Sequence, residues 1–206
     1  MNTEGIIAVI KRISRRMEAE KEYLTDLDNA IADGDHGINM ARGFAAAEQK
    51  LASAAADDIG AVLKSAGMTV VSSVGGSAGP LYGTAFMRAG MIMSGKNEMG
   101  IADFLECMNA AIEGVMQRGK AVRGEKTMLD AMIPALEAMK KAASDGSPAG
   151  EILSCGVAAA REGVEYTKTI AATKGRASYI GERSIGYQDP GATSFMFMLE
   201  EICSFQ

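Results

Sequence analysis

The sequence has 206 residues, of which 48% are hydrophobic and 23% are charged. This composition excludes an intrinsically disordered chain, which combines low hydrophobicity with high net charge, and the length suits a single domain over residues 1–206. A net charge of −5 and an aromatic content of 5% exclude the basic surface and the base-stacking platforms of a nucleic-acid-binding protein.

An uncharged run from Ser65 to Met87 is long enough to cross a bilayer. Its five glycines, one proline and several hydroxyl side chains suit a membrane span poorly, so we expect a buried helix followed by a glycine-rich loop. Three widely separated cysteines, Cys107, Cys155 and Cys203, lie among apolar residues, which is typical of core thiols. We expect a cytoplasmic protein with no membrane association.

Apolar residues recur with the period of an α-helix along the whole chain, and no stretch alternates as a strand does. The stripes predict eight helices, with the first interrupted at Glu20. They cover approximately residues 6–24, 40–51, 59–74, 81–92, 101–115, 128–139, 147–166 and 195–202. Similar lengths and short connections favour an all-α fold, an eight-helix antiparallel bundle or barrel.

Four connections are polar and rich in glycine: residues 28–37, 72–83, 118–127 and 173–193. They follow the first, third, fifth and seventh predicted helices. Alternate connections of an antiparallel bundle share one end, so we expect all four at a single rim. Functional residues concentrate on such loops, and the rim is therefore the predicted site.

The first of these connections carries three carboxylates within eight residues, Asp28, Asp33 and Asp35. Carboxylates this close repel one another unless a cation lies between them. Oxygen ligands without thiolates select Mg²⁺ or Ca²⁺. An EF-hand loop is excluded because the sixth position counted from Asp33 is Ile38 and the twelfth is Phe44. Mg²⁺ remains, with the alternative that the aspartates only terminate and cap helices.

Three further residues suggest contacts with phosphate. His36, the only histidine, follows the aspartates, and a hydrogen bond to phosphate is favoured over a phosphohistidine. The planar guanidinium group of Arg176 can form two parallel hydrogen bonds to a phosphate. Lys126 has two equal interpretations, a phosphate ligand or a solvated charge in the first turn of a helix. Neither 72–83 nor 118–127 has the spacing of a dinucleotide or Walker loop, although glycines before the predicted helix at Pro80 suit an anion.

Five motifs in this order resemble the nucleotide-binding L subunit of dihydroxyacetone kinases, of the phosphotransferase-system type. They are residues 24–37, 75–83, 124–130, 175–179 and 189–194, and the resemblance covers nearly the whole chain. It implies an eight-helix barrel that binds ADP or ATP at one rim through two Mg²⁺ ions held by Asp28, Asp33 and Asp35. The nucleotide contacts it implies are His36, Gly37, Ile38, Asn39, Ser77, Ala78, Gly119, Met128, Arg176, Asp189, Pro190 and Gly191. No catalytic residue is assigned.

The resemblance implies a kinase subunit that keeps ADP as a bound coenzyme. A phosphohistidine on a partner M subunit recharges the ADP, and the phosphoryl group passes to dihydroxyacetone held on a separate K subunit. This branch is favoured because the 206 residues offer no substrate domain. One alternative uses exchangeable ATP with dihydroxyacetone or another short ketose, and a second is a non-enzymatic, nucleotide-dependent regulator. The oligomeric state stays open, a homodimer included.

Overall fold

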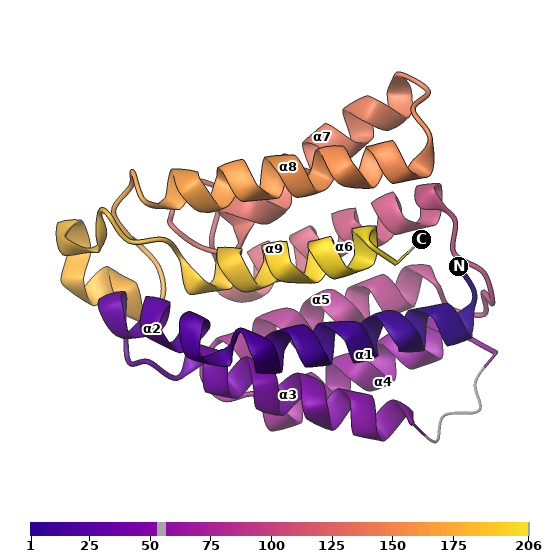
Figure 1. The fold of residues 1–206 in the computed structure, drawn as a ribbon, viewed down its shortest axis with the longest axis horizontal. Coiled ribbons are helices and arrows are strands. Elements are labelled where there is room, and N and C mark those ends of the chain that lie inside the picture. Colours follow the sequence, from indigo (N-terminus) through magenta and orange to yellow (C-terminus); the bar gives the residue numbers. More distant parts are fainter. Residues whose placement is uncertain (53–56, 206) are drawn as a thin grey trace. The chain divides into compact units, whose positions relative to one another are not determined.

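The computed structural model describes residues 1–52 and 57–205, and every regular element in that part of the chain is a helix (Figure 1). The predicted all-α class is therefore confirmed. The elements are α1 (Thr3–Ala19), α2 (Lys21–Ile31), α3 (His36–Leu51), α4 (Ile59–Ser73), α5 (Ala78–Ile92), α6 (Ile101–Gly119), α7 (Leu129–Ser144), α8 (Ala149–Thr167), the 3-10 helix η1 (Arg176–Ser184) and α9 (Pro190–Cys203).

The chain forms two compact units. The first comprises Met1–Ala19 with Asn39–Lys120, and the second comprises Glu20–Ile38 with Ala121–Gln206. The single domain expected from the length stays a prediction.

In the first unit, α4 and α5 pack antiparallel with their backbones in contact. A Cβ atom added to Gly60 would lie 2.6 Å from the carbonyl oxygen of Gly90, and one added to Gly67 would lie 2.8 Å from that of Gly83. Only glycine permits so close an approach at these crossings. The uncharged run of the sequence is thus divided between two short helices, and no helix within the described residues is long and apolar enough to cross a membrane.

In the second unit, α7 and α8 form a pair against which α9 packs. Pro134 inside α7 has no N–H, so it cannot donate to the carbonyl of Asp130 one turn earlier. That carbonyl faces Gly163 of α8 so closely that a side chain there would overlap it. Most of α9 is buried, as expected of a helix that is apolar on nearly all sides. The same unit holds α2, which contacts α9 and η1.

All eight predicted helices are present, with two differences among the described residues. The first predicted helix is divided, because Glu20 leaves helical geometry at φ −96° and ψ 9° between α1 and α2. Charged residues at 18, 20, 21 and 22 give this stretch no buried face to keep it continuous. The second difference is η1, which lies in a segment expected to be a loop. Its glycine-interrupted sequence offers a short apolar pair, Ala177 and Ile180, and Gly181 at φ 53° breaks the helix internally.

Candidate metal and nucleotide site

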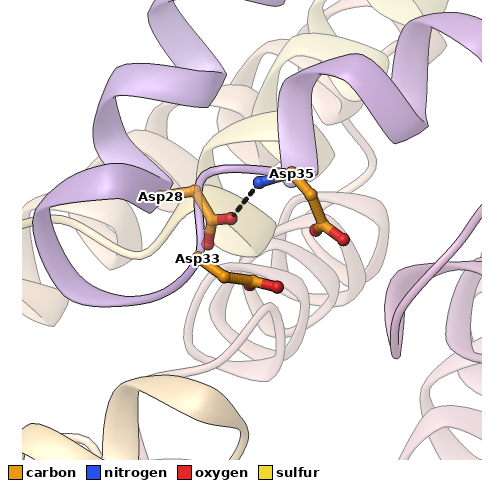
Figure 2. Close-up of side chains that lie close together, drawn as sticks. All are labelled: Asp28, Asp33 and Asp35. Carbon is orange, nitrogen blue, oxygen red and sulfur yellow. Dashed lines mark hydrogen bonds between the residues drawn. The ribbon is translucent and has the colours of Figure 1, made fainter.

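The three aspartates of the first glycine-bearing connection lie together in the second unit. Asp28 is in the last turn of α2, while Asp33 and Asp35 lie on the short loop before α3. One carboxylate oxygen from each lies within 4.8 Å of the other two, and Figure 2 shows the side chains pointing into a common space. The loop turns at Gly34, whose φ of +72° suits glycine. The structure thus brings the predicted metal ligands together, and their role as ligands stays a prediction.

Asp28 organises this loop through hydrogen bonds to its backbone. Its Oδ2 atom accepts from the N–H of Asp35 at 2.9 Å and from the N–H of His36, the first residue of α3, at 3.2 Å. Asp28 therefore also has the structural role of the alternative interpretation, because it accepts from the first N–H group of α3. Burial raises the pKa of Asp28, the two backbone hydrogen bonds lower it, and the charges of Asp33 and Asp35 raise it further. A neighbouring cation would stabilise the charged form of Asp28 against this burial and repulsion.

Arg176 joins the α8–α9 connection to the same cluster. Its Nη1 atom lies 2.9 Å from Oδ2 of Asp33. The two side chains are 61% and 36% exposed, so the pair adds little stability by itself. Arg176 is the first residue of η1 and brings one positive charge to three negative ones.

His36 is buried and neutral. Its Nε2 atom lies 2.9 Å from Oγ of Ser194 in α9, and burial lowers its pKa to about 4. At pH 7 the ring therefore brings a hydrogen bond but no charge. The next residue, Gly37, packs against α2 so closely that a side chain would overlap the carbonyl of Lys21. Ile38, one position further along α3, is 52% exposed.

The start of α9 brings four more predicted nucleotide contacts together. Asp189 caps this helix by accepting from the N–H of Ala192 at 2.7 Å, and Pro190 occupies its first turn. Burial raises the pKa of Asp189 to about 7. A Cβ atom on Gly191 would lie 3.6 Å from Cβ of Met128, so these two residues are neighbours.

The remaining predicted contacts belong to the first unit. Asn39 is buried and accepts a hydrogen bond from Nη2 of Arg42 at 2.7 Å, while Nε of Arg42 donates to the carbonyl of Ser73 at 2.9 Å. Asn39 thus lies beside the 72–83 connection. Ser77 precedes α5, Ala78 is its first residue, and Gly119 is the last residue of α6.

Residues from three of the four glycine-rich connections meet in the second unit. The ion pair of Asp33 and Arg176 joins 28–37 to 173–193, and the N–H of Thr173 donates to the carbonyl of Glu125 at 3.3 Å, which joins 118–127 to it. The connection 72–83 lies in the first unit, so its place at a common rim stays a prediction.

The structure also corrects one interpretation and adds residues that the sequence did not indicate. Lys126 is 1% exposed, so its interpretation as a solvated charge was wrong. Asp130, Ser194 and Arg42 were not singled out as functional. Asp130 carried the best signal in the sequence, since it is an acidic residue at the end of the 124–130 motif. The structure shows that it is fully buried.

The sequence pattern of the DAK2 domain matches residues 30–204. The chain belongs to the DAK2 domain family. Within this family it is 43% identical over 195 residues to the PEP-dependent dihydroxyacetone kinase, ADP-binding subunit DhaL, of Escherichia coli K12, covering 95% of this chain and 93% of that protein. It is 35% identical over 202 residues to the PTS-dependent dihydroxyacetone kinase, ADP-binding subunit DhaL, of Lactococcus lactis, covering 98% and 97%. The resemblance read from the five motifs is confirmed.

A solved structure has the same fold. The dihydroxyacetone kinase of C. freundii, crystallised with AMP-PNP and Mg²⁺, superposes with a TM-score of 0.73 at 22% identity. The match covers 98% of this chain and 34% of the C. freundii chain, so the present chain spans about a third of that kinase.

Proposed function

We propose that this chain is the ADP-binding L subunit of a PEP-dependent dihydroxyacetone kinase. The observation that carries the proposal is the convergence of Asp28, Asp33 and Asp35 within 4.8 Å in a chain of the DAK2 family. The names of the relatives from E. coli and L. lactis support ADP as the nucleotide and a phosphotransferase system as the source of the phosphoryl group.

The residues of the cluster fit Mg²⁺. All three donors are carboxylates, and burial together with the neighbouring charges raises the pKa of Asp28, so a cation would relieve an existing cost. Three carboxylates facing ADP total about −6 charges, which two Mg²⁺ ions would reduce to about −2. Bound Mg²⁺ would supply this neutralisation and would link the diphosphate to Asp28, Asp33 and Asp35.

The chain's own groups would then hold the nucleotide. Asp28 is fixed by two backbone hydrogen bonds, so it needs no rearrangement to act as a ligand. Arg176 forms an ion pair with Asp33 and would bring positive charge to the phosphates, whereas neutral His36 would add only a hydrogen bond. Met128 and Gly191 are neighbours and would form one side of the nucleotide pocket. Phosphoryl transfer depends mainly on such positioning and on charge neutralisation.

The full reaction needs two partners. A K subunit would hold dihydroxyacetone, and a phosphohistidine on an M subunit would convert bound ADP to ATP. The L subunit would carry the phosphoryl group between them, so the isolated chain is expected to be inactive. Asn39, Ser77, Ala78 and Gly119 of the first unit are proposed as further nucleotide contacts on the resemblance alone.

The test begins with native mass spectrometry of the purified chain. One ADP and two Mg²⁺ ions are expected to remain bound. Asp33→Asn should lose the nucleotide while its far-UV circular dichroism stays unchanged. Asp145→Asn, an exposed carboxylate at the end of α7, is the matched control and should retain ADP.

The second step tests the phosphoryl donor. The chain is mixed with the K subunit, dihydroxyacetone and either phosphorylated M subunit or ATP. Transfer from the phosphorylated M subunit without release of labelled ADP is the expected result. Rapid exchange of ADP and turnover of free ATP would instead identify an ATP-dependent ketose kinase. Nucleotide-dependent binding to a partner with no transfer to any ketose would identify a regulator.

A further inference from the structure

The ammonium group of Lys126 is buried and fully hydrogen-bonded to backbone carbonyls. Its Nζ atom donates to the carbonyls of Thr167 and Tyr187, each at 2.5 Å, and to that of Ile170 at 3.4 Å. A lysine ammonium has three N–H donors and no acceptor, so these three bonds satisfy it completely.

These carbonyls lie at both ends of the α8–α9 connection. Thr167 is the last residue of α8, and Tyr187 comes two positions before Asp189, the N-cap of α9. The hydroxyl of Thr167 also accepts from the N–H of Asp189 at 2.9 Å. Lys126 therefore closes the base of a connection whose far part carries Arg176 and whose end carries Asp189.

The backbone around Lys126 is fixed from the other side by Asp130. This buried carboxylate accepts from the N–H of Gly124 at 2.5 Å and from the N–H of Thr127 at 2.8 Å. The next residue, Met128, packs against Gly191. One lysine thus joins the segment that holds Met128 to the segment that holds Asp189 and Gly191.

Two unfavourable features coincide at Lys126. Its φ of +58° costs free energy in any residue except glycine. Its charge is buried, and burial lowers the pKa of the amine, although the charges of Asp189 and Asp130 oppose that shift. Glycine would remove the cost of the positive φ and methionine would remove the cost of the buried charge, but neither supplies the three N–H donors of lysine.

We infer that Lys126 is a positioning residue for the nucleotide, which holds Met128 and the Asp189–Gly191 turn at the separation that ADP requires. The inference rests on the proposed function. It assigns Lys126 no contact with the nucleotide and no part in phosphoryl transfer.

The test compares Lys126→Met and Lys126→Gly with Lys120→Met. Lys120 is an exposed lysine that also has a positive φ, of 48°, so its substitution reproduces the chemical change and the backbone conformation. The probes are the dissociation rate of a fluorescent ADP in Mg²⁺ and amide hydrogen exchange of peptides that contain Asp189. Both Lys126 variants should release ADP at least tenfold faster and exchange the Asp189 amide faster. Lys120→Met should behave as the unsubstituted chain.

Chemical rescue distinguishes the loss of the ammonium group from a general loss of packing around position 126. Butylammonium added to Lys126→Gly should slow ADP release again, whereas butanol at the same concentration should not. Equal ADP release from the unsubstituted chain and both Lys126 variants would overturn the inference alone, and so would equal rescue by butanol. Loss of helical circular dichroism in both variants would also overturn it, since Lys126 would then hold the fold. No ADP binding by the unsubstituted chain would overturn the proposed function, and this inference with it.

Discussion

Asp28→Asn should stabilise the chain without Mg²⁺ and abolish its stabilisation by Mg²⁺. The substitution removes one charge from the carboxylate cluster but keeps a side-chain oxygen that can accept from the N–H groups of Asp35 and His36. The fold should therefore survive, while the metal site loses its most buried ligand. A purely helix-capping role for Asp28 predicts the opposite, a loss of stability with no change in metal response.

The geometry of the cluster sets the magnitude. Two unit charges 4.8 Å apart repel by about 3 kcal/mol at an effective dielectric constant of 20. Asp28 takes part in two such pairs, but solvent around Asp33 and the cation of Arg176 reduce the total. A neutral amide also accepts the two N–H bonds more weakly, at a cost of about 1 kcal/mol. We expect a net gain of about 1–2 kcal/mol in the free energy of unfolding in EDTA.

Urea unfolding followed by far-UV circular dichroism measures both effects. In Mg²⁺ at about 100 times its Kd, the unsubstituted chain should gain about 2.7 kcal/mol over its value in EDTA. Asp28→Asn should gain almost nothing, and Asp145→Asn should respond as the unsubstituted chain does. Equal Mg²⁺ stabilisation of Asp28→Asn and the unsubstituted chain would refute the assignment of Asp28 as a ligand.

Three further predictions concern buried groups. The pKa of Asp189 is raised from 3.8 to about 7, so its contribution to stability is complete below pH 3.8 and is lost as the pH rises through 7. The free energy of unfolding should fall by about 4 kcal/mol over this range. In Asp189→Asn, urea unfolding at several pH values should show no such fall. Gly163→Ala should destabilise the chain by about 1–3 kcal/mol in urea unfolding because the methyl meets backbone, whereas Gly156→Ala, which meets the flexible side chain of Met139, should cost less. Burial raises the pKa of the Cys107 thiol to about 12, so a thiol reagent at pH 8 should leave it unmodified in the native chain, as read by mass spectrometry of its peptide.

Each of these has a clear contrary result. The same pH dependence in Asp189→Asn and the unsubstituted chain would show that another group causes it. Equal urea midpoints for the two glycine variants would mean that α7 and α8 separate easily at Gly163. Modification of Cys107 at the rate measured in urea would contradict its burial.

The sequence predicted the parts of the site that are local. Asp28, Asp33 and Asp35 lie within eight residues, so a helix end and one tight loop are enough to gather them. The helices were predicted equally well, because burial of one face imposes the 3.6-residue period. The sequence showed a gap in that period at Glu20, but it did not show that the helix divides there.

The position of Lys126 could not be predicted in this way. Its partners at Thr167 and Tyr187 are 41 and 61 residues away, and all of its bonds go to backbone carbonyls. A carbonyl group is present at every residue, so no side-chain pattern records which ones the lysine meets. The 3-10 helix at Arg176–Ser184 was not predicted for a related reason. Contacts with α2 hold it, and its apolar pair, Ala177 and Ile180, is too short a pattern to indicate a helix.

The glycine crossings of α4 and α5 restrict how this protein can change over evolution. A core of interlocking side chains accommodates a larger residue when a neighbour rotates, but two backbones in contact contain nothing that can rotate. A methyl group at Gly67 would lie 2.8 Å from the carbonyl oxygen of Gly83, so the two helices would have to move apart at this crossing. Substitutions that tune stability should therefore be tolerated at other positions more readily than at this crossing.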